Sequence, residues 1–401
     1  MKRRRNCDGK DRTSGLTDCL SLQRRRRNYD GDGKDRISAL PDCILLKILS
    51  HLKTKQAIQT SFISPRWKNL WKHIPVLSFN YTRYGSLEKF TRFVSQCLSL
   101  RDDKASLQAL NFECREFIKP HLLKRIMKYV FSHNVQQLHM AVACNILHFP
   151  LCNFPCHTLT SLRLTSSKQR SLFPNSLALP ALTHLSIELF AFHCTSDDDY
   201  AEPFSVFKSL NTLIIHYCEV FNERNPCEEN LFISSVSLVN LTISLSSHPH
   251  KFKLSTPNLC SFDFFGDPLQ NLCGRNSNSN NNTNFSSIKH VKISVPFSTA
   301  GEEFPSILFN WLVELALMES LTISLKTLQI LNLIPESWKI DFHYLHNLKL
   351  LKIDASQYHL SSLPDGIGDF LLQNAPSAKK VIKCLPRPGW STLNIKRLEQ
   401  A

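Results

Sequence analysis

Residues 210–215 read Leu-Asn-Thr-Leu-Ile-Ile, with apolar side chains at the first, fourth and sixth positions. The same frame recurs along most of the 401-residue chain, at intervals of 21–30 residues. A single frame carries little information in a leucine-rich chain, but a long series at a steady interval indicates a repeat architecture. The frames begin at Leu107, Val135, Leu159, Leu182, Leu210, Leu238, Leu259, Ile288, Met318 and Leu348.

The frame predicts one short strand per repeat, because two apolar residues at alternate positions bury one face. No repeat buries that face alone, so stacked repeats share one elongated core, as in leucine-rich repeats. The usual asparagine is mostly absent, which indicates an irregular repeat. Between Met318 and Leu348 the register stays open, since Leu328-Leu331-Leu333 also fits the frame.

Helical spacing of apolar residues predicts helices between strands, at about Ser86–Leu100, His121–Ser132 and Pro305–Met318. Near the end of the chain, Asp365–Asn374 is expected to be a helix and Lys379–Cys384 a closing strand. The composition of Gly274–Asn284 and of acidic Ser196–Glu202 predicts loops.

The segment Asp35–Asn80 differs from the repeats and predicts three short helices. Pro41 opens the first helix, which carries a broad apolar stripe of Ile44, Leu45, Ile48, Leu49 and Leu52. The second begins near Thr54 and places Ile58 and Phe62 on one face. The third begins at Ser64-Pro65 and carries Trp67, Leu70 and Trp71. So small a module is expected to complete its core against a partner or the neighbouring domain.

This segment resembles the plant type of F-box. Pro65 and Lys53 depart from the usual pattern at two helix boundaries. The resemblance implies that the module joins a Skp-type adaptor of a cullin-based ubiquitin ligase, while the repeats hold a protein substrate. It covers about 45 residues, and its landmarks are Leu40-Pro41-Asp42, Ile48-Leu49-Ser50-His51-Leu52, Ser64-Pro65-Arg66-Trp67 and Leu70-Trp71.

The family match implies one set of site residues, and the geometry of stacked repeats predicts a second. Those expected to face the adaptor are Leu40, Pro41, Ile44, Leu45, Ile48, Leu49, Leu52, Trp67 and Trp71. The residues between the two strand apolars are expected on a concave, substrate-binding face: Arg163, Ser186, Ile214, Thr242, Asp263, Lys292, Thr322 and Lys352. The alternative is that the module is only a helical cap on the repeats.

The expected fold class is α plus α/β, a small three-helix F-box followed by a curved leucine-rich-repeat solenoid. The expected boundaries are a disordered basic arm at 1–34, the F-box at 35–80, the repeat domain at 81–385 and a tail at 386–401. Within the arm, residues 8–22 partly duplicate 32–46 but run into Arg24–Arg27, so this copy is expected not to fold.

The net charge of +15 is unevenly placed: residues 1–36 carry twelve Lys/Arg and six Asp/Glu, a net of +6, and the other 365 residues carry a net of +9. The basic runs Lys2–Arg5 and Arg24–Arg27 are consistent with nuclear import, weak nucleic-acid contact or a solvated tail. The remaining excess is too dispersed to favour nucleic acid. Without a membrane-spanning run or a secretory signal, we expect a nuclear or cytoplasmic protein.

No catalytic motif is recognisable, so an enzyme is not expected. His148, Cys152, Cys156 and His157 could offer zinc ligands, but they sit around one loop and lack two separated knuckles, so neither metal nor cofactor is expected. The alternative function is a repeat scaffold or binding protein that recruits no ligase.

Deleting residues 1–30 is expected to leave adaptor binding and the melting temperature unchanged while reducing nuclear accumulation, because the arm carries charge but no core. Adaptor pull-down, thermal melts and imaging of a tagged protein check this. A large loss of adaptor binding or stability would show that the duplicated segment packs.

Overall fold

The protein is described from a computed structural model. It divides into two compact units, Met1–Ser167 and Lys168–Ala401, which are treated separately. The basic arm, its partial duplicate, Gly274–Asn284, most of Ser196–Glu202 and the C-terminal tail lie outside the described residues. Those described are 37, 39–143, 156–167, 171–174, 177–194, 200–221, 230–245, 250–272, 285–296, 302–335, 337–338, 345–359 and 368–385. No helix in these ranges is long and apolar enough to span a membrane.

The first unit begins with a helical module, as expected, but with two α-helices instead of three. They are α2 (Asp42–Ser50) and α3 (Thr54–Gln59), and 3₁₀ turns follow at Thr60–Phe62, Pro65–Lys68 and Leu70–His73. The expected third helix is therefore wrong as an α-helix. Pro65 does open the turn, but the Ser64 side chain makes no cap hydrogen bond. Asn69, at φ −112°, separates the two later turns.

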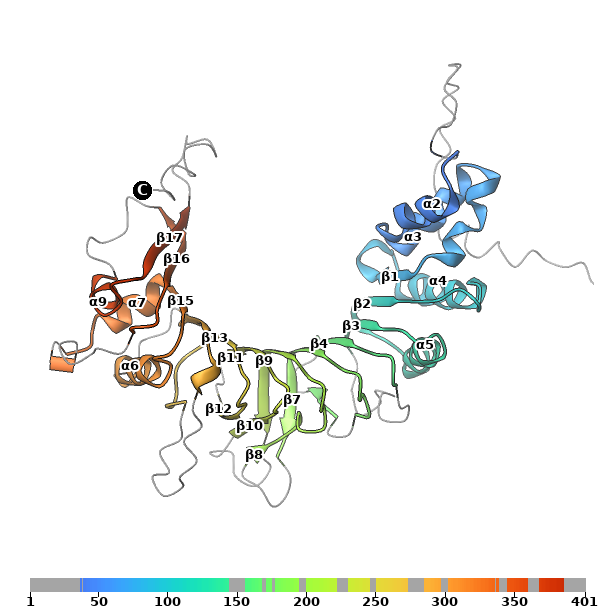
Figure 1. Cartoon of the computed structure of the whole chain (residues 1–401). Helices are drawn as coiled ribbons and strands as arrows, with labels where there is room; N and C mark the ends of the chain where they lie inside the picture. The colour runs from blue at the N-terminus through green and yellow to red at the C-terminus, as the bar shows by residue number, and fades with distance from the viewer. Residues whose placement is uncertain are drawn as a thin grey trace, which may run out of the picture. The chain divides into compact units, whose positions relative to one another are not determined.

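The same unit continues into a parallel sheet whose strands follow chain order: β1 (Val76–Asn80), β2 (Ala109–Phe117), β3 (Gln137–Ala143) and β4 (Ser161–Ser166). The connecting helices α4 (Leu87–Leu100) and α5 (Pro120–Ser132) lie on one side of it (Figure 1). Strand β1 was not expected. Its residues Ile74, Leu77 and Phe79, at most 2% exposed, repeat the apolar frame one repeat before Leu107.

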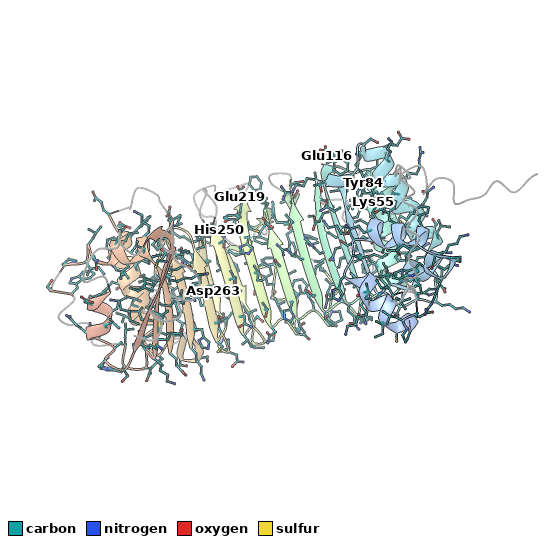
Figure 2. The ribbon with its side chains drawn as sticks, turned by 90° about the horizontal axis from the view of Figure 1, so that it is seen from above. Lys55, Tyr84, Glu116, Glu219, His250 and Asp263 are labelled. Carbon is teal, nitrogen blue, oxygen red and sulfur yellow. The ribbon has the colours of Figure 1, made fainter. Side chains whose placement is uncertain are left out.

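The second unit contains a longer parallel sheet, also in chain order. Its strands are β6 (His184–Glu188), β9 (Thr212–Phe221), β11 (Asn240–Leu245), β13 (Ser261–Phe265), β14 (His290–Ser294), β15 (Ser320–Ser324), β16 (Leu350–His359) and β17 (Lys379–Leu385). Helices α6 (Phe304–Glu314), α7 (Leu325–Leu331) and α9 (Asp369–Gln373) accompany its last strands. Seen from above in Figure 2, the strands run side by side.

The apolar frame is confirmed in every repeat that the sequence predicted. All its residues are buried, none more than 3% exposed. Neighbouring strands hold them in register: Leu213, for example, lies opposite Leu185 and Leu241. The competing frame Leu328-Leu331-Leu333 is wrong as a strand, because its first two residues belong to α7.

Around β6–β13, where the sequence predicted no element between the repeat strands, the connections contain further short strands. They are β5 (Ser171–Leu172), β7 (Phe190–His193), β8 (Tyr200–Ala201), β10 (Asn230–Ser234) and β12 (Lys251–Ser255). In β10 and β12 buried and more exposed residues alternate, which is the period of a strand and not of a helix. Strands β12, β10 and β8 form a separate three-stranded sheet.

A buried arginine joins several parts of the first unit. The side chain of Arg101 is at the end of α4 and only 3% exposed. Its guanidinium donates to the carbonyl oxygens of Ile74 (2.9 Å), Ala105 (2.8 Å) and Ser106 (2.7 Å), and to the Tyr129 hydroxyl (3.2 Å). It thereby ties the last residues of the helical module to α4 and α5.

Replacing Arg101 with methionine is expected to lower the free energy of unfolding by about 2–4 kcal/mol, because buried carbonyls lose a charged donor. Urea denaturation of the full chain measures this. The matched control is Arg92→Met, which removes an exposed arginine paired with Glu88 at 2.9 Å and should cost under about 1 kcal/mol. Equal effects of the two substitutions would contradict the assigned role.

His250, next to the start of β12, is a second buried polar residue, at 3% exposed. Neither ring nitrogen has a hydrogen-bond partner among the described residues. Burial lowers the pKa of His250 from 6.5 to about 4. The unfolded chain therefore binds a proton below pH 6.5 that the folded chain does not, so stability falls as the pH drops towards 4.

Between pH 7 and pH 5 this residue is expected to cost about 2 kcal/mol of stability. His250→Gln should reduce the pH dependence of the unfolding free energy by that amount, as measured by urea denaturation at both values. His290→Gln, which removes an exposed histidine, should leave the dependence unchanged. If the unfolding free energy of the His250 variant depended on pH as strongly as that of the wild type, His250 would not be the source of this dependence.

Candidate functional site

The first candidate site is one side of helix α2. The helix buries Leu45 and Leu49 completely, whereas Ile44 and Ile48 on another side are 43% and 41% exposed. Residues four positions apart lie on the same helix face, so the two isoleucines form one exposed aliphatic surface. A cluster of exposed large apolar side chains on a small module is typical of a protein-binding surface.

The other residues predicted to face the adaptor fall into two groups. Pro41 is exposed and Leu40 and Leu52 are half-buried, so these three are accessible beside Ile44 and Ile48. Leu45, Leu49, Trp67 and Trp71 are at most 4% exposed and pack inside the module. The buried residues therefore form the core of the module and support the accessible ones.

Three exposed apolar residues of the module were missed as candidates: Ile37, Phe62 and Ile63, which are 58%, 60% and 61% exposed. The sequence placed Phe62 on the same face as Ile58, but Ile58 is buried. The difference arises because α3 ends at Gln59 and the chain continues as a 3₁₀ turn, which changes the angular spacing.

An ion pair fixes the start of α2 to the segment after Ser64. The guanidinium of Arg66 donates to the Asp42 carboxylate through Nη2 at 2.5 Å and Nε at 3.1 Å. Asp42 also lies in the first turn of α2, where a negative charge is favoured by the helix dipole. Both side chains are partly exposed, so the pair mainly orients these segments and adds little stability.

The second candidate site is the open face of the sheet in the second unit, by which we mean the side carrying the residues between the buried apolar positions. Strand register aligns seven predicted residues in one row across neighbouring strands: Ser186, Ile214, Thr242, Asp263, Lys292, Thr322 and Lys352. Figure 2 marks Asp263 within this row. Arg163 belongs to β4 of the first unit, where it is exposed and lies opposite His139.

Within the row, Asp263 is partly buried beside a positive charge. Burial raises the pKa of this carboxyl, while the neighbouring Lys292 acts in the opposite direction. The two residues are directly opposite in the register of β13 and β14. Counted along the row from β6, Asp263 and Lys292 are the first charged residues.

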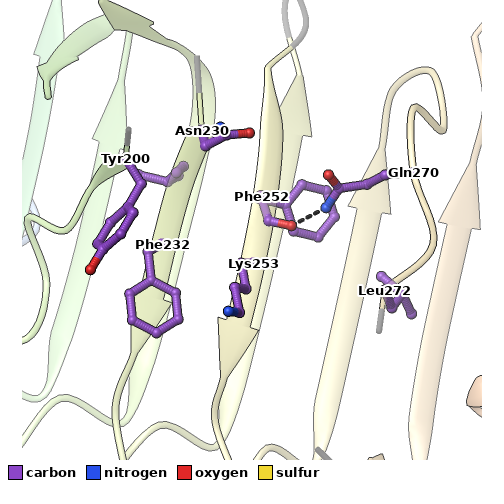
Figure 3. A pocket seen from close by; sticks show the side chains of 8 residues that line it. Tyr200, Asn230, Phe232, Phe252, Lys253, Gln270 and Leu272 are labelled. Carbon is purple, nitrogen blue, oxygen red and sulfur yellow. Dashed lines mark hydrogen bonds between the residues drawn. The ribbon is translucent and has the colours of Figure 1, made fainter. Parts of the chain in front are cut away.

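A concavity of about 290 Å³ lies on the three-stranded sheet of the second unit. Tyr200, Phe232 and Lys253 line it, with the Lys253 ammonium 5.7 Å from the centre of the Phe232 ring. Gln270 closes another side and donates to the Phe252 carbonyl (Figure 3). The sequence did not indicate this concavity, because its residues come from strands that were not expected.

Within the described ranges, no three of the His, Cys, Asp and Glu side chains gather as a metal site. Of the possible zinc ligands, Cys156 and His157 are described, whereas His148 and Cys152 lie outside these ranges.

Comparison with known proteins agrees with this arrangement. The F-box domain family matches residues 37–79, which contain α2, α3 and the 3₁₀ turns. An F-box protein of Arabidopsis thaliana is 30% identical over 242 residues, covering 57% of this chain and 50% of that protein. F-box/LRR-repeat protein 13 of the same plant is 30% identical over 211 residues, covering 49% and 43%.

A third relative, an Arabidopsis F-box/FBD/LRR-repeat protein, is 29% identical over 221 residues, covering 54% of this chain and 43% of that protein. The chain thus spans about half the length of the curated relatives it matches. The chain therefore contains an F-box domain at residues 37–79, followed by an apolar repeat frame, and it is similar to plant proteins named as F-box and F-box/LRR-repeat proteins.

Proposed function

We propose that this protein is the substrate-recognition subunit of a cullin-based, SCF-type ubiquitin ligase. The observation that carries the proposal is the exposed pair Ile44 and Ile48 on a helix of the F-box domain. This surface would bind a Skp-type adaptor, and through it a cullin. The buried residues Leu45, Leu49 and Trp71 would hold it in shape.

The repeats would hold the protein substrate on their open face. In-register parallel strands support the leucine-rich-repeat architecture, and the curved solenoid stays a prediction. In this role the chain supplies no catalytic group. It raises the effective concentration of a substrate near a ubiquitin-conjugating enzyme, which is a positioning effect.

The alternative is a repeat scaffold or binding protein whose helical module only caps the repeats. A cap turns its large apolar side chains towards the repeats. Ile44, Ile48 and Ile63 are instead turned to solvent, each at least 41% exposed, which favours adaptor binding. Nuclear or cytoplasmic residence is part of the same proposal.

Replacing Ile44 and Ile48 together with alanine is expected to weaken binding of a purified Skp-type adaptor to the full chain by at least about tenfold. Each truncation removes roughly 1 kcal/mol or more of apolar contact. Biolayer interferometry measures the affinity, and a thermal melt checks that the fold persists, since both side chains are already exposed.

The matched control for that experiment is Lys47→Ala with Lys68→Ala, which trims two exposed residues of the same module. It should leave the affinity within about twofold. An isoleucine double variant that is folded and binds the adaptor as tightly as the wild type would support the cap alternative.

A further inference from the structure

Lysines gather at one end of the open face in the second unit. Lys292 on β14, Lys352 on β16, and Lys379 and Lys383 on β17 all point to this side, because strand register aligns them with other open-face positions. Lys292, Lys379 and Lys383 are exposed, and Lys352 is half-buried. We call these four residues the basic patch.

The other end of the same face lacks this charge. On β6, β9 and β11 none of the open-face positions is lysine or arginine. These positions are His184, Ser186, Glu188, Thr212, Ile214, His216, Asn240, Thr242 and Ser244. Because the strands follow chain order, the open face changes along the sheet from an end with no lysine or arginine to a basic end.

The patch lysines differ from three neighbouring lysines, which make ion pairs within 4 Å. Lys289 and Lys349 both contact the Glu319 carboxylate, at 3.7 Å and 2.6 Å, and Lys380 lies 3.5 Å from Asp369. None of the four patch lysines has an ion-pair partner within 4 Å among the residues that the structure describes. Their charge is therefore available to a partner.

Two carboxylates accompany the patch, Asp354 on β16 and Asp263 on β13. The Asp354 carboxylate accepts hydrogen bonds from the backbone and side chain of Ser356 at 3.2 Å and 2.6 Å. Burial acts to raise its pKa, but these bonds and the charges of Lys383 and Lys292 outweigh it and lower the pKa. Asp354 thus interacts electrostatically with lysines on both sides of its strand. Four lysines and two aspartates together leave the patch with a net positive charge.

We propose that the basic patch binds an acidic segment of the protein substrate, in an inference that rests on the proposed function. Lys292 and Lys352 are two strands apart, which is about 10 Å. Carboxylates three residues apart in a polyproline II segment lie on the same side of the chain and are separated by about 9 Å. Thr322, between the two lysines on β15, offers a hydroxyl to the same segment.

A polypeptide fits this surface better than a nucleic acid. A phosphate backbone calls for a continuous positive stripe, whereas Asp354 lies within the patch and Asp263 beside it, and both would repel closely spaced phosphates. A peptide can place its carboxylates opposite the lysines and leave neutral residues opposite the two aspartates. Such charge matching adds selectivity and speeds association more than it adds affinity.

The test uses the purified full chain and a fluorescein-labelled peptide of about ten residues with glutamate at every third position. Fluorescence anisotropy measures binding at low and moderate salt. Lys292→Glu with Lys352→Glu is expected to weaken binding about tenfold or more. The control, Lys208→Glu with Lys251→Glu, makes the same charge change at exposed sites outside the patch and should change it less than twofold.

A third variant, Asp354→Asn, is expected to strengthen peptide binding about threefold. Asparagine keeps an oxygen for Ser356 but removes the repelling charge, and a damaged fold would not produce a gain. The proposal is overturned if both lysine pairs weaken binding equally. It is also overturned if the glutamine version of the peptide binds as well, or if a single-stranded oligonucleotide of equal charge binds more tightly than the peptide.

This experiment contains no adaptor, so its outcome is separate from that of the ligase proposal. If the patch and control variants bound the peptide equally well while adaptor binding stayed intact, only the inference of an acidic segment would be wrong. Failure of adaptor binding with intact patch specificity would remove the ligase role and leave a repeat protein that binds acidic segments.

Discussion

The structure depends on one constraint: a strand with a single apolar face is stable only when neighbouring strands cover that face in register. Each repeat supplies three apolar residues, and none of them is more than 3% exposed. A slip of one residue would turn Leu213 and Ile215 to solvent and bury Ile214 and His216. The same register that builds the core therefore fixes which side chains form the open face.

The same apolar frame also connects the F-box domain to the sheet. Ile74, Leu77 and Phe79 carry the apolar frame directly after the last 3₁₀ turn, so the module leads into β1 without a linker. Arg101 reinforces this junction through the Ile74 carbonyl. With the core of the module completed in this way, α2 can leave Ile44 and Ile48 exposed for a partner.

Local periodicity was enough to predict the repeat strands and α4, α5 and α6, but it did not separate the exposed Ile44 and Ile48 of α2 from the buried Leu45 and Leu49. It failed where geometry depends on tertiary contacts. The second helix ends at Gln59, which leaves Phe62 and Ile63 exposed, and the expected third helix is a pair of 3₁₀ turns. Strands β10 and β12 lie where no element was predicted. The basic patch could not be predicted from the sequence, because strand register decides that Lys289 and Lys349 share the Glu319 carboxylate, whereas Lys292 and Lys352 make no ion pair within 4 Å among the described residues.

The central claim is that two separate surfaces serve adaptor and substrate. Hydrogen–deuterium exchange of the full chain, with and without a Skp-type adaptor, tests it most directly. The account predicts added protection confined to the F-box domain, in α2 and the turns through His73, with unchanged exchange in β13–β17. Protection in β13–β17, or none in α2, would contradict it.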